Sequence, residues 1–213
     1  VFTGVDTRQK KAIPIGELHM LLNKDPQSEK LRRTQAIANL LFQFCGMPFS
    51  DLAHLEKSNL ERGLLKYNRT KTGTPMSIEV LESAQNAIGG LYNKSDARSS
   101  GYPDYLFRIL SGAYKRNEEG AYREYQSALR RFNNELKSLS RKLRLHSPVT
   151  SYTLRHSWAT TAKYRGVPIE MISESLGHKS IKTTQIYLKG FELEERTRVN
   201  KLNYSYVCSF KMF

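Results

Sequence analysis

The chain has 213 residues, of which 34 are Lys or Arg and 20 are Asp or Glu, giving a formal net charge of +14 at pH 7. Its 39% hydrophobic residues suffice for a folded core, and no apolar run is long enough to span a membrane as a helix. The positive charge is spread along the chain, which favours a folded protein that binds a polyanion, most often nucleic acid. A membrane surface, or a generally basic protein, is the alternative explanation of the charge alone.

The cysteine content and the N-terminus indicate where the protein works. Cys45 and Cys208 are too few for a disulfide framework and lack zinc-binding spacing. Residues 1–13 contain no signal-peptide core. We therefore expect a reducing, intracellular setting, the cytoplasm. The absence of an initiator Met indicates a fragment or an excised domain.

Helical periodicity dominates the chain after a basic linker at residues 1–13. In chain order, we predict helices or helical turns at residues 15–23, 25–44, 49–55, 81–92, 122–143 and 153–164, then one that begins after Pro168 and ends at Gly177, and a last one capped by Ser180. Gly46 and Pro48 end the second helix. The apolar stripe over residues 122–143 alternates steps of three and four, and its simplest explanation is a core-facing helix with a basic outer face.

Two segments break the helical pattern. The runs Leu64–Asn68 and Met76–Val80 flank a turn that contains Gly73 and Pro75, which predicts a β-hairpin. Aromatic residues alternate within the C-terminal tail, residues 191–213, which predicts a strand or a docking arm. We expect a single, mainly helical domain with one small sheet.

Five side chains could together act on a DNA phosphodiester: Lys71, Arg155, His156, His178 and Tyr187. A Tyr can attack phosphorus if a base or nearby cations help it to ionise. An Arg clamps the phosphate oxygens, a His donates or moves a proton, and a Lys on a hairpin can protonate the leaving oxygen. Cationic groups can supply the charge stabilisation, so neither a metal nor another cofactor is required. Each residue taken alone also has an ordinary structural explanation.

The segment LRHSWATTAKYRGVPIEMISESLGHKSIKTTQIYL closely resembles the C-terminal motif of the tyrosine recombinases, the phage-integrase family. It looks most similar to integrases of Bacteroides-type mobile elements. Arg155, His178 and Tyr187 fall on the family's catalytic Arg, on the His of Leu-Gly-His, and on the nucleophilic Tyr nine residues later. The segment RTKTG resembles the hairpin that carries the family's catalytic Lys, which is Lys71 here.

The resemblance implies a tyrosine recombinase catalytic domain at residues 14–190, mainly α with a small antiparallel sheet. Residues 1–13 would be the linker to a core-binding domain that the sequence lacks, and residues 191–213 would be a tail that packs on a neighbour or on its own domain. The implied reaction is attack of Tyr187 on a phosphate of double-stranded DNA, which gives a 3′-phosphotyrosyl link and a free 5′-hydroxyl. Four protomers would assemble on two DNA attachment sites, in a bacterial cytoplasm.

Two positions depart from the family pattern. Tyr152 stands where the family has the His of His-x-x-Arg, although a phenol can still donate a hydrogen bond to a phosphate oxygen. The family's first Arg is absent from the segment Cys45–Pro48. The loss of one such clamp is expected to cost several kcal/mol of transition-state stabilisation.

Another Arg could replace the missing one. Arg69 is the first candidate because it precedes Lys71 by two residues, and an extended strand would direct both side chains to one face. Arg32 and Arg33 on the preceding predicted helix are the next candidates.

Three nearby residues have predicted supporting roles. Asp51 either supports His178 or an Arg through hydrogen bonds, or caps a helix near Ser50. His156 is expected to be structural or to support the site from behind, because it points about 100° away from Arg155 on the helix. Trp158 is predicted to be a core residue that anchors this helix.

Three other functions are compatible with the same residues. One is a DNA-binding recombinase relative whose catalysis is weakened or lost with the first Arg. Another is a type IB topoisomerase-like enzyme that nicks and closes DNA without synapsis. The third is a basic helical protein that carries the motif by coincidence.

Overall fold

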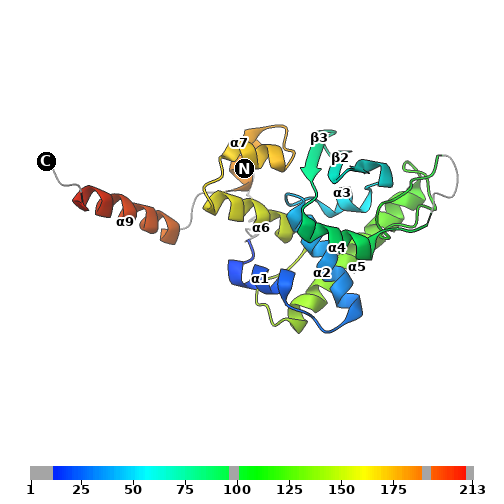
Figure 1. The fold of residues 1–213 in the computed structure, drawn as a ribbon, viewed down its shortest axis with the longest axis horizontal. Coiled ribbons are helices and arrows are strands. Elements are labelled where there is room, and N and C mark those ends of the chain that lie inside the picture. Colours follow the sequence, from blue (N-terminus) through cyan, green and yellow to red (C-terminus); the bar gives the residue numbers. More distant parts are fainter. Residues whose placement is uncertain (1–11, 96–100, 189–192, 210–213) are drawn as a thin grey trace, which may run out of the picture.

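The computed structural model describes residues 12–95, 101–188 and 193–209. In chain order its elements are α1 (Ile15–Asn23), α2 (Glu29–Gln43), α3 (Phe49–Ala53), the 3₁₀ turn η1 (Lys57–Asn59), β1 (Leu60–Glu61), β2 (Leu64–Asn68), β3 (Pro75–Glu79), α4 (Glu82–Leu91), α5 (Glu119–Lys142), α6 (Ser151–Tyr164), α7 (Ile169–Ser175), α8 (Ile181–Tyr187) and α9 (Leu193–Ser209). The predicted fold, mainly α with a small antiparallel sheet, is confirmed (Figure 1).

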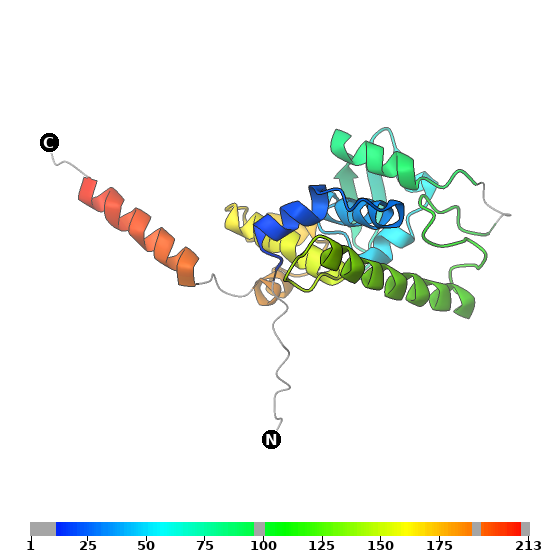
Figure 2. The ribbon, with the colours of Figure 1, turned by 90° about the horizontal axis from the view of Figure 1, so that it is seen from below.

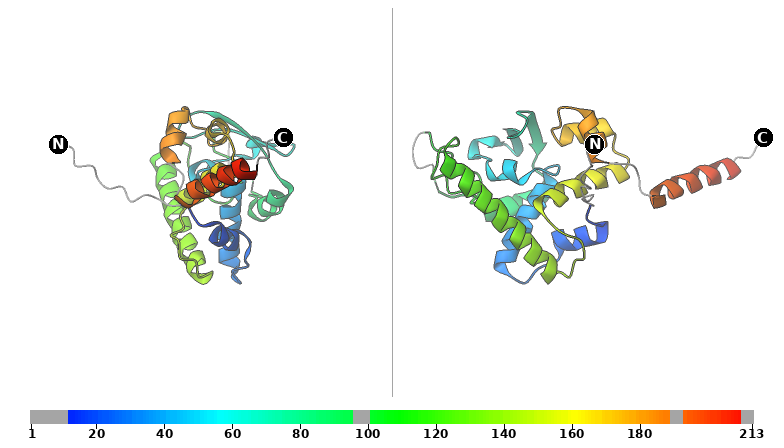
Figure 3. Two further views of the ribbon diagram at one scale, coloured as in Figure 1. Left: turned by 90° about the vertical axis from the view of Figure 1, so that its left-hand side faces the viewer. Right: turned by 180° about the vertical axis from the view of Figure 1, so that it is seen from behind.

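Helix α2 lies at the centre of the domain, in contact with α1, α4, α5 and α6. Ile37, Leu40 and Leu41 recur at helical spacing and are buried, as the sequence predicts for a core helix. The long helix α5 runs along one side (Figure 3). It meets α3 through Phe132, whose ring stacks on Phe49 with the centroids 4.7 Å apart. This core fixes the end of α2 against α6.

The segment that carries the recombinase-like motif forms a second, smaller apolar cluster from α6, α7 and the residue after α8. Ala159, Ile172, Leu176 and Leu188 are buried together, and the half-buried Trp158 packs against them. The predicted core role of Trp158 is therefore confirmed. The cluster binds these three helices into one unit beside the main core.

The predicted hairpin is confirmed. Strands β2 and β3 pair antiparallel, with Asn68 opposite Pro75, and β1 adds to the other edge of β2. Hydrogen bonds from Arg69 N to the Thr74 carbonyl and from Gly73 N to the Arg69 carbonyl close the turn. The expectation that Arg69 shares an extended strand with Lys71 is wrong, because β2 ends at Asn68 and residues 70–72 form the turn.

The strand prediction for the tail is wrong, because Leu193–Ser209 form helix α9. This segment contains no Gly or Pro and is rich in Glu, Arg, Lys and Leu, whose helical preference outweighs the alternation of aromatic residues. Helix α9 stands clear of the domain (Figures 1 and 2), and its side chains from Arg196 to Ser205 are exposed. Most of the predicted linker, residues 1–11, and the last residues of the tail, 210–213, lie outside the described residues.

Within the described residues, none of the helices combines the length and the apolar character that crossing a membrane requires.

The central position of α2 predicts how stability responds to truncation. Leu40→Ala should lower the free energy of unfolding by about 2–5 kcal/mol, because Leu40 is fully buried and its loss leaves a cavity. Ile15→Ala, at a position 69% exposed, is the matched control and should change it by less than about 0.5 kcal/mol. Urea denaturation followed by circular dichroism measures both, and equal losses in the two variants would contradict the central role of α2.

Candidate active site

The site lies where α6 crosses the end of α2, next to the hairpin turn and the loop between α7 and α8. After α2, the chain turns through Cys45 and Gly46, which have φ angles of 55° and 64°. A Cβ added at Gly46 would lie 3.2 Å from the Cβ of Trp158 and 3.3 Å from the backbone of Arg155. The glycine therefore allows α6 to approach the end of α2 closely.

Arg155 is built into the interior and is not a solvated surface charge. It is 7% exposed, although it lies on a helix. Its Nη1 donates to the Gly46 carbonyl at 2.8 Å, and its Nη2 donates to the Leu176 carbonyl at 2.6 Å. The same Nη2 lies 3.3 Å from Nε2 of His178. The guanidinium thus connects the end of α2 with the α7–α8 loop.

Arg69 reaches the same place from the hairpin. It is 7% exposed, its Nε donates to Oδ2 of Asp51 at 3.1 Å, and its Nη1 donates to the Leu176 carbonyl. Arg69 and Arg155 therefore share one backbone oxygen as their acceptor. Two guanidinium groups held together in this way form a local excess of positive charge suited to an anion such as a phosphate.

Asp51 supplies a negative charge beside Arg69. Its side chain is fully buried, and Oδ1 accepts hydrogen bonds from Thr70 N at 3.2 Å and from the Ser50 hydroxyl at 3.3 Å. Of the two predicted roles, the helix cap is wrong, because the N-cap of α3 is Pro48 and no side chain caps it. Asp51 instead holds the Arg69 side chain and the first residue of the hairpin turn.

Gly177 makes room for Arg69. A Cβ at this position would lie 2.8 Å from Sδ of Met76 and would overlap Cδ of Arg69, and its φ angle is 65°. The glycine of Leu-Gly-His therefore serves two purposes, since it ends α7 in the left-handed region and leaves space for an arginine side chain to pass.

His178 follows directly and faces the two arginines. Burial, then the charges of Arg155, Arg69 and Lys71, lower the pKa of His178 to about 4. The ring is therefore neutral near pH 7 in the free protein. Its Nδ1 lies 2.8 Å from Oγ1 of Thr184 on α8. Lys71 is exposed in the hairpin turn, and its charge acts on this ring.

Tyr187 is the last residue of α8, and the backbone around it is anchored. Lys163 of α6 donates from Nζ to the Leu188 carbonyl at 3.0 Å, and the Leu188 amide donates to the Thr184 carbonyl at 2.8 Å. Leu188 itself is buried in the small apolar cluster. The end of α8 is thus docked on α6, the helix that carries Arg155. The side chain of Tyr187 lies outside the described residues.

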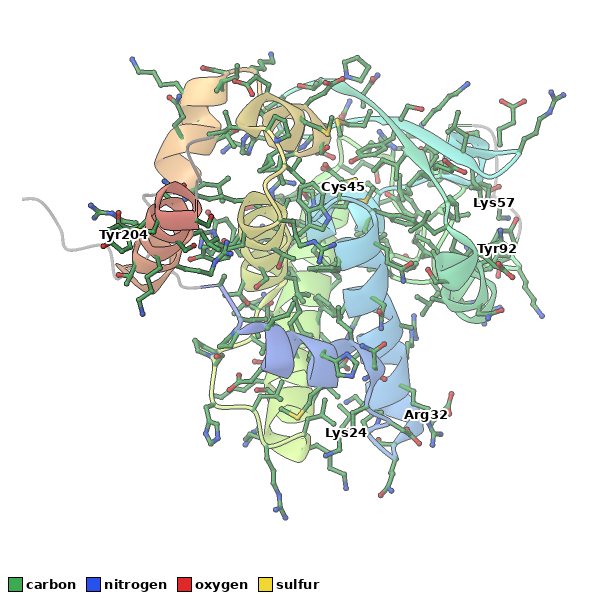
Figure 4. The ribbon with its side chains drawn as sticks, turned by 60° about the vertical axis from the view of Figure 1, so that its left-hand side comes forward. Lys24, Arg32, Cys45, Lys57, Tyr92 and Tyr204 are labelled. Carbon is green, nitrogen blue, oxygen red and sulfur yellow. The ribbon has the colours of Figure 1, made fainter. Side chains whose placement is uncertain are left out.

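The remaining predicted residues lie around this centre or away from it. Tyr152 is 43% exposed, one turn before Arg155 on α6. His156 is half-buried, and burial lowers its pKa. Arg32 and Arg33 are wrong as candidates for the missing Arg, because they lie at the start of α2, about 20 Å along the helix from Gly46. Figure 4 labels Arg32 and Cys45 at opposite ends of α2.

Arg32 and Arg33 also have other partners. The Nε of Arg32 pairs with Asp25 at 2.9 Å, and Arg33 donates to the Arg108 carbonyl. Both contacts lie at the far end of α2, so neither side chain is directed toward the site.

Sequence reasoning missed four groups: the Leu176 carbonyl, Tyr67, Lys163 and Thr184. Tyr67 on β2 is half-buried, and burial followed by the charge of Asp51 raises its pKa. Its place on the predicted hairpin, close in the sequence to Arg69 and Lys71, could have indicated it. A backbone carbonyl that serves two arginines leaves no trace in the sequence.

Comparison with known proteins shows which family the chain belongs to. The phage integrase family matches residues 15–193. The chain belongs to this family. Among its relatives, a probable integrase/recombinase protein of Methanocaldococcus jannaschii is 28% identical over 201 residues, covering 91% of this chain and 57% of that protein. The tyrosine recombinase XerD of Halalkalibacterium halodurans is 30% identical over 190 residues, covering 84% of this chain and 57% of the relative.

Solved structures share the fold of this phage integrase family chain. The XerA recombinase has a TM-score of 0.65 at 21% identity, covering 94% of this chain and 66% of its own. The Tn1549 transposon integrase, in complex with a circular intermediate DNA, has a TM-score of 0.63 at 16% identity, and the match covers 92% of this chain and 67% of the integrase chain. The chain spans 57% of the length of the two curated relatives, so it corresponds to a part of them.

Alanine substitutions at two glycines test whether the Arg69 side chain lies against Gly177. Gly166→Ala should lower the free energy of unfolding by about 1 kcal/mol, since its φ of 77° is strained for Ala but the space around it is open. Gly177→Ala, at a similar φ of 65°, should cost about 1–3 kcal/mol more, because the methyl group displaces Arg69. Urea denaturation measures both, and equal costs would show that Arg69 does not pass over Gly177.

Proposed function

We propose that the chain is the catalytic part of a site-specific DNA recombinase, an integrase that cleaves and rejoins double-stranded DNA through a 3′-phosphotyrosyl intermediate. The observation that carries this proposal is the convergence of Arg69 and Arg155 on the Leu176 carbonyl, beside a neutral His178. Two guanidinium groups and an imidazole at one point match the charge and the hydrogen-bonding capacity of a phosphodiester.

Each residue then has a defined role. The Tyr187 oxygen attacks phosphorus, and the bond from phosphorus to the 5′-oxygen breaks. Arg69 and Arg155 stabilise the charge that develops on the non-bridging oxygens. Lys71 delivers a proton to the departing 5′-oxygen from the exposed hairpin turn, while His178 exchanges a proton with the nucleophile or binds a phosphate oxygen. The reverse reaction, with the 5′-hydroxyl of a partner strand, reseals the DNA.

In this proposal Arg69 replaces the Arg that the family pattern places in Cys45–Pro48. The support is geometric: Arg69 is buried, paired with Asp51 and bonded to the same carbonyl as Arg155. Asp51 acts as the support of this clamp. A substituted clamp favours an active enzyme over a DNA-binding relative that has lost catalysis. The phenol of Tyr152, at the edge of the site, would donate a hydrogen bond to a phosphate oxygen. His156 would have a supporting, structural role on α6.

The charge of the chain and its similarity to other integrases support the partners and the setting that we propose. A net charge of +14 suits the DNA backbone, and the similar Tn1549 integrase is in complex with DNA. The exposed helix α9, with Tyr204 73% exposed, is available to pack on a neighbouring protomer, in keeping with a homotetramer on two synapsed sites. The setting would be the cytoplasm of a bacterium that carries a mobile element of the Bacteroides type.

Covalent capture tests the reaction. We expect the full-length protein, on a suicide duplex that carries its attachment site, to form a protein–DNA adduct that is absent in Tyr187→Phe. If the wild-type protein formed none, the proposed enzyme activity would be wrong. Relaxation of supercoiled DNA without strand exchange would instead indicate a topoisomerase-like enzyme.

The replacement clamp has its own test. Arg69→Lys keeps the charge but loses the planar fork, so single-turnover cleavage should fall about 10²–10³-fold, as on removal of an oxyanion-stabilising donor. Arg62→Lys, in the exposed turn before β2, is the matched control and should retain the wild-type rate. If Arg69→Lys cleaved normally while Lys71→Ala did not, Arg69 would not be the substitute.

The charge leads to a prediction about binding. A plot of log Kd against log salt concentration should be steep, with about 0.9 counterions released for each phosphate that Lys and Arg neutralise. Fluorescence anisotropy with a labelled duplex measures the slope, and a flat response would rule out the DNA backbone as the partner.

A further inference from the structure

The hydroxyl group of Thr184 is a feature of the site that the sequence did not single out. Thr184 is fully buried on α8, one turn before Tyr187. Its Oγ1 lies 2.8 Å from Nδ1 of His178, across the short loop between α7 and α8. A fully buried hydroxyl at this distance from a ring nitrogen is a polar contact inside the site, whereas the adjacent Thr183 is exposed.

The other ring nitrogen determines which atom carries the proton. Nε2 of His178 lies 3.3 Å from Nη2 of Arg155, and a guanidinium group only donates hydrogen bonds. Nε2 must therefore accept in this contact. Because the ring is neutral near pH 7, its single proton lies on Nδ1 and is donated to Oγ1 of Thr184.

We propose that Thr184 is a positioning residue, whose hydroxyl fixes the ring orientation and the tautomer of His178, so that the unprotonated Nε2 faces the Arg155 guanidinium. This inference rests on the proposed recombinase function, in which the phosphate binds beside these two arginines. An unprotonated Nε2 that exchanges its contact with Arg155 for one with the substrate can take up a proton, for example from the phenol of the attacking tyrosine, and as an N–H it can then donate to a phosphate oxygen.

Thr184 also couples this ring to the helix of the nucleophile. Its side chain contacts His178, while its carbonyl accepts from the amide of Leu188, the residue after Tyr187. Lys163 holds the Leu188 carbonyl from α6. A displacement of α8 would therefore change the orientation of the His178 ring, so the position of the nucleophile and the protonation state of the site are linked through one residue.

Three variants separate the hydroxyl from the packing. Thr184→Val preserves the branched shape but removes the hydrogen bond, Thr184→Ser preserves the hydroxyl, and Thr183→Val is the matched control at the exposed neighbour. The measurements on the full-length protein are single-turnover cleavage of a suicide duplex, the Kd for the uncleaved duplex, and nitrogen-15 NMR of the ring. The His178 resonances are assigned by their loss in His178→Gln.

We expect Thr184→Val to lower the cleavage rate about 10–100-fold, as for other residues that orient a functional His, with the Kd changed less than about twofold. Its NMR spectrum should change from a single Nδ1-protonated ring to a mixture of tautomers. Thr184→Ser and Thr183→Val should retain the wild-type spectrum and rates within about threefold.

Two results would overturn the inference: a wild-type ring spectrum and cleavage rate in Thr184→Val, or equal impairment in Thr184→Ser, which would assign the effect to packing. The NMR measurement needs no reaction. If the wild-type protein formed no covalent adduct, the recombinase proposal would fail, and the ring spectra of Thr184→Val and Thr184→Ser would still decide whether Thr184 sets the tautomer.

Discussion

The carbonyl of Leu176 is the point on which the rest of the site depends. Arg69 from the hairpin and Arg155 from α6 both donate to this one oxygen. The carbonyl is available because α7 ends there, at a glycine that also leaves space for Arg69. A helix terminus with unpaired carbonyls thus provides the acceptor that holds two positive charges together in the interior.

Holding like charges together opposes folding, and the structure offsets this in two ways. The carboxylate of Asp51 pairs with Arg69 at a fully buried position, and His178 remains neutral because its surroundings lower its pKa to about 4. Removal of one partner of a buried ion pair such as Asp51 and Arg69 generally lowers the free energy of unfolding by about 3–5 kcal/mol, because the other charge is left buried. Burial of the apolar side chains in the two clusters stabilises the fold and offsets the remaining cost of this cationic centre.

The sequence predicted the elements well where the local signals were strong. The hairpin followed from its turn residues, and the helix at residues 15–23 followed from its apolar spacing, because both depend on neighbours in the chain. The tail was misjudged because alternating aromatics occur in helices too. Arg69 was singled out for its spacing from Lys71 on a strand that does not extend that far. What brings it to the site is its contact with Asp51 and the space over Gly177.

By itself, the sequence determined the family pattern, the positive charge and the residue types available for phosphate chemistry, because these are properties of residue identity and short-range spacing. Only the tertiary structure decided which cations meet. Arg69, Arg155 and His178 come from three segments more than twenty residues apart in the chain. They converge because the end of α2 packs on α6, and because a backbone carbonyl and a buried hydroxyl orient them. Contacts of this kind leave no recognisable pattern in the sequence, so only the folded chain shows them.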